Sequence, residues 1–186
     1  APGKYLDFGT VGNVILLFIV VIGTVNGTNF TDGLDGLATS VTSLVATFFT
    51  VVALGLGSGI DPITCATLGA LLGFLLFNGY PASVFMGDTG SLALGGFVAA
   101  CAYMMQMPLF ILIVGFIYLA EVVSVMLQVS YFKLTHGKRI FKMAPIHHHF
   151  EMCGWKEKKI CRVFSLVNAI GCLIAVLIIY YGRAIY

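Results

Sequence analysis

Six long apolar runs divide this chain, and they decide what it can fold into. They cover residues 8–25, 37–56, 63–77, 92–107, 108–132 and 163–181. A helix that crosses a membrane needs about 20 predominantly apolar residues. Only 10% of the residues are charged, whereas a soluble domain carries roughly 25%. The alternating periodicity of β-barrel strands is absent from the sequence. We therefore predict an all-α integral membrane protein, with six transmembrane helices in a single domain that covers residues 1–186.

The basic residues predict which loops face the cytoplasm. Eight of the ten Lys and Arg residues lie between residues 133 and 162. Loops on the cytoplasmic side of a membrane protein carry an excess of Lys and Arg. Counting six spans outward from that loop places the loops at 26–36 and 78–91 on the same side, and both chain ends on the other. Nearly all of the Asn-, Asp- and His-rich sequence then lies on the cytoplasmic face.

The first of these loops repeats a polar residue every third position. Asn26, Asn29, Asp32 and Asp35 follow this spacing and are interleaved with glycines that disfavour a regular helix throughout. Carboxylates bind cations or accept hydrogen bonds from sugar hydroxyls, and amides both donate and accept. Capping of the next helix by Asp35 is the simpler explanation, but it accounts for only one of the four. We predict a ligand-binding loop.

The second loop contains the run Gly-Asp-Thr-Gly-Ser around Asp88. We expect the next helix to begin near Leu92, with Thr89 or Ser91 as its cap. The N-terminus of a helix favours an anion, and an aspartate beside it suits a Mg²⁺ ion that bridges to phosphate oxygens. The alternative is that Asp88 itself is only a cap. Phe85 either anchors the loop at the membrane interface or stacks on a nucleobase.

The third loop holds three consecutive histidines, His147, His148 and His149, after Pro145. Adjacent side chains diverge on any regular backbone, so we do not expect a three-histidine metal site. Hydrogen bonding to phosphates, or proton relay near neutral pH, is the better use of such residues.

One acidic residue, Glu121, lies inside a predicted span. An ionisable side chain within the membrane is costly and usually faces the interior of the helix bundle. We expect its partner to be Gln128 or a helix outside this chain. Structural pairing and a place on a substrate pathway both remain open. We also expect Gly115 to kink the same long segment.

Taken in order, the three motifs resemble those of the phospho-N-acetylmuramoyl-pentapeptide transferases, a branch of the polyprenyl-phosphate N-acetylhexosamine-1-phosphate transferase superfamily. The motifs are Asn29-Phe-Thr-Asp32-Gly-Leu-Asp35, Phe85-Met-Gly-Asp88-Thr-Gly-Ser91 and Pro145-Ile-His147-His148-His149-Phe-Glu151. The resemblance covers the whole chain, and the run of three histidines is characteristic of the muramoyl-pentapeptide branch.

The resemblance implies a reaction and a setting. Members of this family transfer phospho-MurNAc-pentapeptide from UDP-MurNAc-pentapeptide to undecaprenyl phosphate, with Mg²⁺, to give lipid I and UMP. They lie in the bacterial inner membrane with ten spans, an active site on the cytoplasmic face, and often a homodimeric state. This chain corresponds to the second part of that ten-helix bundle. The family's Asp-Asp motif is absent from the sequence, so we expect an N-terminal half to supply it.

The resemblance also implies roles for individual residues. Asp88 corresponds to the Mg²⁺ ligand, and Asp32, Asn78 and Phe85 to the nucleoside pocket. Asn29 and Asp35 lie beside that pocket as further substrate-binding residues. The residues implied to contact phosphate or sugar are His147 and His148, as catalytic residues, and His149, as a binding residue. Direct attack by the lipid phosphate and a route through an enzyme nucleophile both remain open.

Three other functions compete with this interpretation. A related transferase would use UDP-GlcNAc. An intramembrane aspartic protease would pair Asp88 with Asp32 or Asp35, because two close carboxylates can share a proton, but it would leave the asparagines and histidines unused. A transporter would place its polar residues near the bilayer midplane, whereas here they lie in surface loops. We expect no nucleic-acid partner.

Overall fold

The computed structural model describes residues 8–184, and this part of the chain contains helices and no strand. The α-helices are α1 (Gly9–Thr31), α2 (Leu37–Leu56), α3 (Asp61–Asn78), α4 (Gly87–Met104), α5 (Ile111–Val114), α6 (Phe116–Leu134), α7 (Ile146–Met152) and α8 (Glu157–Ala184), with a 3₁₀ turn η1 at Pro108–Phe110. The predicted all-α class is confirmed. The predicted single domain also includes residues 1–7 and 185–186, which lie outside the described residues.

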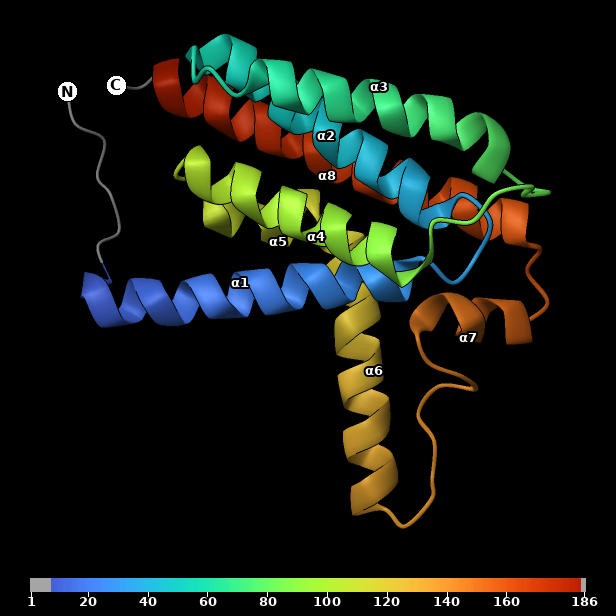
Figure 1. The fold of residues 1–186 in the computed structure, drawn as a ribbon. Coiled ribbons are helices and arrows are strands. Elements are labelled where there is room, and N and C mark those ends of the chain that lie inside the picture. Colours follow the sequence, from blue (N-terminus) through green and yellow to red (C-terminus); the bar gives the residue numbers. More distant parts are fainter. Residues whose placement is uncertain (1–7, 185–186) are drawn as a thin grey trace.

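Five long helices, α1, α2, α3, α4 and α8, run along a common direction (Figure 1). The turn from α1 to α2, the loop from α3 to α4, and α7 with the start of α8 all lie at one end of this bundle. The described chain begins and ends at the opposite end. The three polar segments therefore share one end of the molecule, as the positions of the basic residues predicted.

The core of the bundle lies around α2. This helix packs between α3 and α8, and Val41, Val45 and Phe49 on it are fully buried. By contrast, α1 and α3 expose apolar side chains such as Phe18 and Leu76. A helix that is apolar on all sides belongs either in a protein core or in a membrane. The exposed apolar faces of α1 and α3 are therefore surfaces for lipid or for other membrane helices.

Five of the helices are long and apolar enough to cross a membrane, namely α1, α2, α3, α6 and α8. They account for five of the six predicted spans. The fourth predicted span is α4, which lies against α1. Its first turn carries Asp88 and Ser91, and this polar start lowers its overall hydropathy.

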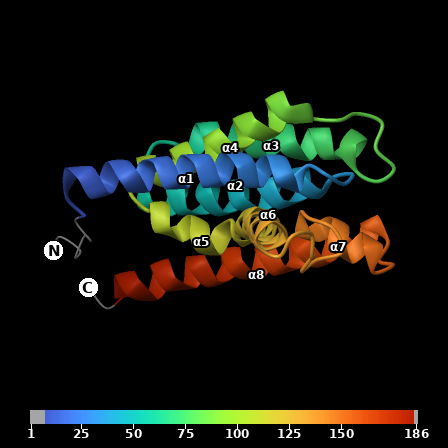
Figure 2. The same cartoon turned by 90° about the horizontal axis from the view of Figure 1, so that it is seen from below.

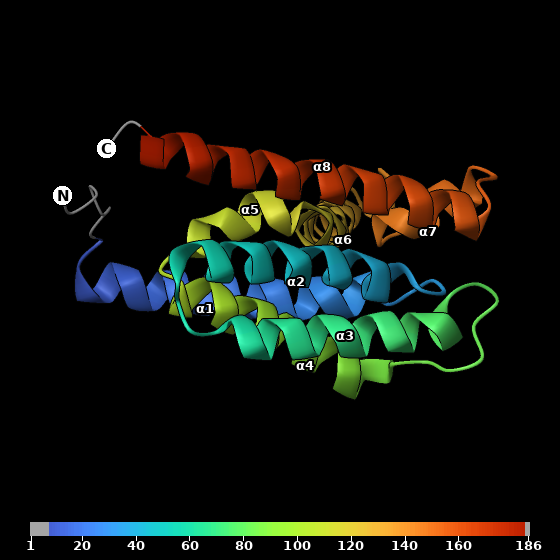
Figure 3. The ribbon, with the colours of Figure 1, turned by 90° about the horizontal axis from the view of Figure 1, so that it is seen from above.

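The fifth predicted span is not one continuous helix, which corrects the sequence prediction. The chain forms η1 and α5, and then breaks at Gly115, whose φ of −107° and ψ of 26° are not helical. Beyond the break, α6 leaves the bundle and crosses the direction of the other helices, so that it is seen end-on in Figures 2 and 3. The predicted kink at Gly115 is confirmed.

Two helix ends also differ from the prediction. Helix α1 continues to Thr31, so Asn26 and Asn29 lie on its last turns and only residues 32–36 form the turn. Helix α4 begins at Gly87 rather than near Leu92, and no side chain caps it. The hydroxyl of Ser91 instead donates a hydrogen bond to the Gly87 carbonyl within the helix. Likewise, α2 has no side-chain cap.

The contact between α1 and α4 depends on a missing side chain at Gly95. A Cβ atom there would lie 2.5 Å from the Cα of Val25, whereas one at the neighbouring Gly96 would meet nothing within 4 Å. We expect Gly95→Ala to destabilise the protein by about 1–3 kcal/mol, because overpacked sites cost that much. Thermal unfolding in detergent measures this effect. Gly96→Ala is the matched control and should leave the melting temperature unchanged or slightly raised. Equal melting temperatures for the two variants would contradict the close approach.

Candidate active site

Three segments of the chain meet at the polar end of the bundle. They are the end of α1 with the turn at residues 32–36, the start of α4 with the loop before it, and α7 (Figure 1). Every residue singled out from the sequence as a candidate site residue lies on one of these segments or, for Asn78, at the end of α3.

Asn29 joins the first two segments. Its side-chain amide donates hydrogen bonds to Oδ1 of Asp88 and to Oγ of Ser91, both at 3.0 Å. The two residues on α4 are three positions apart, so they lie on the same face of that helix. Asn29 therefore holds the carboxylate of Asp88 in place against the last turn of α1.

Asp32, which follows α1, lies close enough to Asp88 for the two charges to interact. Burial of the half-buried Asp32 carboxyl, and to a lesser extent the negative charge of Asp88, raise its pKa from the usual 3.8 to about 6. A half-buried carboxyl group whose charge is disfavoured by a second carboxylate nearby marks a region where a cation is favoured. Asn29, Asp32 and Asp88 are thus brought together, as the sequence predicted.

Asp35 and Asn78 have structural partners within the same end of the bundle. Oδ2 of Asp35 accepts a hydrogen bond from the Ala82 backbone N–H at 2.9 Å. The buried Asn78 accepts from the Thr39 hydroxyl at 2.5 Å and donates to the Val84 carbonyl at 3.0 Å. These bonds shape the loop between α3 and α4. Contact of either residue with a substrate stays a prediction.

Phe85 lies near the end of that loop, two residues before α4 begins, and 72% of it is exposed. The loop is held on both sides of this residue, by Asp35 and Asn78 before it and by Asn29 after it. An exposed aromatic side chain on a restrained loop offers a flat apolar face three positions before Asp88 in the sequence.

The three histidines lie on consecutive positions of α7, but they do not all diverge as predicted, because the ring centroids of His147 and His148 are only 4.1 Å apart. His147 points into the protein and is fully buried, whereas His148 is half-buried and its Nδ1 lies 2.5 Å from Oε2 of Glu151. Nδ1 of His149 accepts a hydrogen bond from the Lys142 backbone N–H at 3.1 Å. His149 therefore helps to hold the preceding loop.

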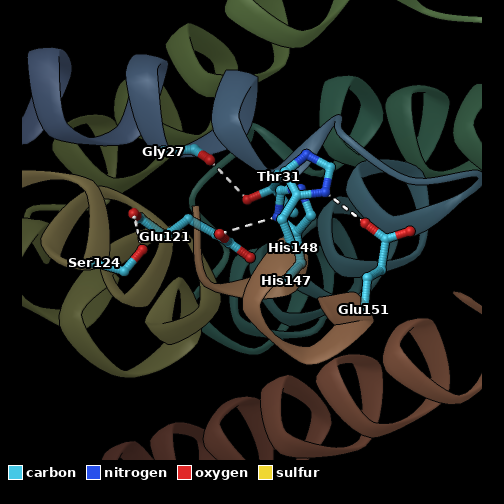
Figure 4. Close-up of polar contacts among 7 residues, drawn as sticks. All are labelled: Gly27, Thr31, Glu121, Ser124, His147, His148 and Glu151. Atoms are coloured by element: carbon cyan, nitrogen blue, oxygen red, sulfur yellow. Dashed lines mark hydrogen bonds and ion pairs between the residues drawn. The ribbon is translucent and has the colours of Figure 1, made fainter. Parts of the chain in front are cut away.

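The partner of the buried Glu121 is His147, which the sequence did not predict. Oε2 of Glu121 lies 3.1 Å from Nδ1 of His147, and both side chains are at most 1% exposed (Figure 4). The two atoms are at ion-pair distance, although neither has the orientation of a regular hydrogen bond. Gln128, the expected partner, instead accepts hydrogen bonds from the backbone N–H groups of Ile140 and Phe141.

Aromatic and basic side chains of α7 and α8 pack against residues of the neighbouring loops. The Phe150 ring on α7 packs against Trp155, with ring centroids 4.9 Å apart. The ammonium groups of Lys159 and Lys158 lie 3.9 Å and 4.8 Å from the ring centres of Trp155 and Tyr80, respectively. Since Tyr80 belongs to the loop before α4, these contacts connect the second and third segments of the site.

Comparison with known proteins shows which families share this sequence. The chain matches glycosyl transferase family 4 over residues 2–106. It is 61% identical over 155 residues to a phospho-N-acetylmuramoyl-pentapeptide-transferase of Clostridium novyi (strain NT), an alignment that covers 83% of this chain and 47% of that protein. Proteins of the same name from Clostridium perfringens (strain 13) and Clostridium acetobutylicum (strain ATCC 824) are 60% and 58% identical over 171 and 165 residues. These alignments cover 91% and 88% of this chain, and 53% and 51% of the relatives. The chain therefore spans about half the length of the relatives it matches.

The raised pKa of Asp32 gives a testable pH dependence. The folded value of about 6 lies above the unfolded value of 3.8. The folded protein therefore binds the proton more tightly, and the contribution of this group to stability is present below pH 3.8 and lost as the pH rises through about 6.

We expect Asp88→Asn to lower the pKa of Asp32, but not to 3.8, because burial is the larger cause. Infrared difference spectra of the metal-free protein measure the carboxyl titration. Asp61→Asn, at the other end of the bundle, should leave it unchanged, and an equal shift in both variants would contradict the proximity of Asp32 and Asp88.

Proposed function

Because the chain belongs to glycosyl transferase family 4, we propose that it forms part of an enzyme that transfers phospho-MurNAc-pentapeptide from UDP-MurNAc-pentapeptide to undecaprenyl phosphate. The products are lipid I and UMP, and the reaction serves peptidoglycan synthesis. The observation that carries the proposal is the cluster of Asn29, Asp32 and Asp88 at one end of a membrane bundle, in a chain that is 61% identical over 155 residues to a phospho-N-acetylmuramoyl-pentapeptide-transferase.

The same cluster fits a Mg²⁺ ion. Asp32 and Asp88 supply carboxylate oxygens, which Mg²⁺ prefers, and Mg²⁺ uses only one or two protein carboxylates when phosphates and water supply the remaining ligands. The mutual repulsion of the two carboxylates is itself relieved by a cation. We propose Asp88 as the principal ligand, held by Asn29, with Asp32 beside it. When bound, Mg²⁺ neutralises charge on the diphosphate of the sugar nucleotide.

The other predicted site residues take places around this centre. We propose that Phe85 stacks on the uracil base, since it is more exposed than Tyr80, the other aromatic residue of the adjacent loop. Asp35 and Asn78 hold that loop at the edge of the nucleoside pocket. On α7, we propose that His148, as an imidazolium with its Nδ1–H directed at the Glu151 carboxylate, donates a hydrogen bond from Nε2 to phosphate or sugar, because 26% of its side chain is exposed. Oriented in this way, the ring leaves Nε2 for the substrate.

In the proposed reaction an oxygen of the lipid phosphate forms a bond to the β-phosphorus of the sugar nucleotide. The bond from that phosphorus to the oxygen bridging the two phosphates breaks, and UMP leaves with the electron pair. Such a transfer depends mainly on positioning and on electrostatic stabilisation. The chain contributes to the positioning, through the loop that carries Phe85 and through Asn29 and His148.

The lipid substrate requires an apolar surface next to the site. A cavity of about 450 Å³ lies between α6 and the loop that follows it, lined by apolar Val125, Val129 and Phe132 and by the basic Lys133 and Arg139. An apolar wall with basic residues at its rim fits a polyprenyl chain that ends in a phosphate. We propose this face of α6 as part of the path of the lipid tail.

We further propose that the enzyme lies in the bacterial inner membrane with this site on the cytoplasmic face. Supporting this, the basic residues are concentrated between residues 133 and 162. We propose that a further segment beside the site supplies the Asp-Asp motif that the resemblance implies, because this sequence contains no Asp-Asp pair. A homodimer is part of the proposal on family resemblance alone.

The decisive experiment measures UMP release by the complete enzyme from UDP-MurNAc-pentapeptide and undecaprenyl phosphate, with Mg²⁺ and with EDTA. We expect Asp88→Asn to reduce kcat/KM by at least about a hundredfold, because a metal ion contributes several kcal/mol to such a transition state. Asn26→Ala is the matched control, since its exposed amide donates a hydrogen bond to the Ile22 carbonyl within its own helix, α1. UMP release that persists in EDTA, or none from the unmodified enzyme, would refute the proposal. UDP-GlcNAc as the donor tests the related transferase.

Phe85 provides a second prediction about the nucleotide. Stacking of a base on an aromatic ring contributes about 1–3 kcal/mol. We therefore expect Phe85→Ala to raise KM for the sugar nucleotide about tenfold, and Phe85→Trp to keep it near the original value. Phe77→Ala, another exposed aromatic residue at the end of α3, should not change KM. If the Phe77 and Phe85 variants had the same KM, Phe85 would not be the stacking residue.

A further inference from the structure

The buried contact between Glu121 and His147 joins two helices that otherwise diverge. Glu121 lies on the first turns of α6, just beyond the break at Gly115, and His147 lies on the first turn of α7. The Oε2–Nδ1 distance is 3.1 Å, and both side chains are shielded from solvent. Because solvent does not reach these side chains, water cannot take the place of either partner. The contact therefore fixes the position of α7 relative to α6.

The opposite edge of the His147 ring packs against the turn that follows α1. A Cβ atom at Gly33 would lie 2.3 Å from Nε2 of His147, so the ring fits only because residue 33 has no side chain. Gly33 directly follows Asp32. The imidazole therefore lies between the Glu121 carboxylate on one side and the backbone of the Asp32 turn on the other (Figure 4).

His147 also contacts the histidine that faces the site. The ring centroids of His147 and His148 are 4.1 Å apart, and His148 is held from its other side by Glu151. His147 therefore packs against both His148 and Gly33, the residue that follows Asp32.

We infer that Glu121 and His147 are positioning residues for the proposed transferase reaction, and that they act by holding the Asp32 turn and α7 in register at the site. This assignment rests on the proposed function. It gives His147 a place behind the reacting groups, since its ring has no exposed surface from which to reach a substrate. It also gives the membrane-buried carboxylate of Glu121 a role in the geometry of the site.

Steady-state kinetics of the complete enzyme test this role. We expect Glu121→Gln to lower kcat for UMP release at least about tenfold with less than a twofold change in KM for the sugar nucleotide, because small misplacements of reacting groups have large effects on rate. Gly33→Ala, which pushes the ring from the other side, should have the same signature. Because the two groups act as one unit, the double variant Glu121→Gln with His147→Gln should be no slower than the slower single variant.

Tyr118→Phe is the matched control. Tyr118 lies one turn before Glu121 on the same helix, is also buried, and its hydroxyl is bonded to Thr42 at 2.7 Å. Loss of that bond should lower the melting temperature without changing kcat. A kcat loss in Tyr118→Phe equal to that in Glu121→Gln would overturn the assignment, as would additive losses in the double variant.

A second measurement does not depend on activity. Hydrogen–deuterium exchange, read by mass spectrometry on the folded fraction, should be faster in residues 31–36 and 145–152 of Glu121→Gln and unchanged there in Tyr118→Phe. Unaltered exchange in both segments of Glu121→Gln would overturn the inference. If the unmodified enzyme released no UMP while Glu121→Gln still showed faster exchange in these two segments, the proposed function would be refuted. The positioning role of the contact would then still hold.

Discussion

Helix α4 lies directly on α1 at Gly95, where the Cα of Val25 occupies the space of a side chain. The two helices run in opposite directions, so the same line of contact leads to Asn29 on α1 and Ser91 on α4, each four residues nearer the polar end. Four residues are about one helical turn. The separation of the helices at this contact therefore sets how closely Asp88 approaches the end of α1, and with it the smaller of the two causes, after burial, that raise the pKa of Asp32.

The second side of the site depends on α6, which leaves the bundle and so needs its own connection to the polar end. Glu121 and His147 make that connection inside the protein. Removing one partner from such a buried contact leaves the other polar group unpaired inside the protein, which costs about 1–3 kcal/mol. Each of the two residues therefore depends on the other. Together with the packing of His147 on Gly33, their contact links α6, α7 and the Asp32 turn.

Much of the site could be predicted from the sequence because its residues are polar or charged, and such residues are rare in membrane-spanning helices unless they have a function. The polar motifs containing Asp32, Asp88 and His148 stand out between apolar runs, and so does Glu121 inside a run. The partners of these residues could not be predicted. Glu121 meets a residue 26 positions later in the sequence only because α6 turns out of the bundle. Asp35 looked like a helix cap or a ligand-binding residue, yet it holds the backbone of Ala82 in another loop.

The sequence by itself determined the all-α class and the lengths of the apolar segments, because a segment in lipid must satisfy its own backbone hydrogen bonds. It also determined that the three polar loops lie at one end, because the basic residues indicate which loops share one side of the membrane. These are properties of each segment alone. Only the tertiary structure decided the break at Gly115 and the crosswise course of α6, the spacing of Asp32 and Asp88, and the burial of His147. Each of these depends on contacts between segments that are distant along the chain, and no local pattern encodes the distance at which two helices pack.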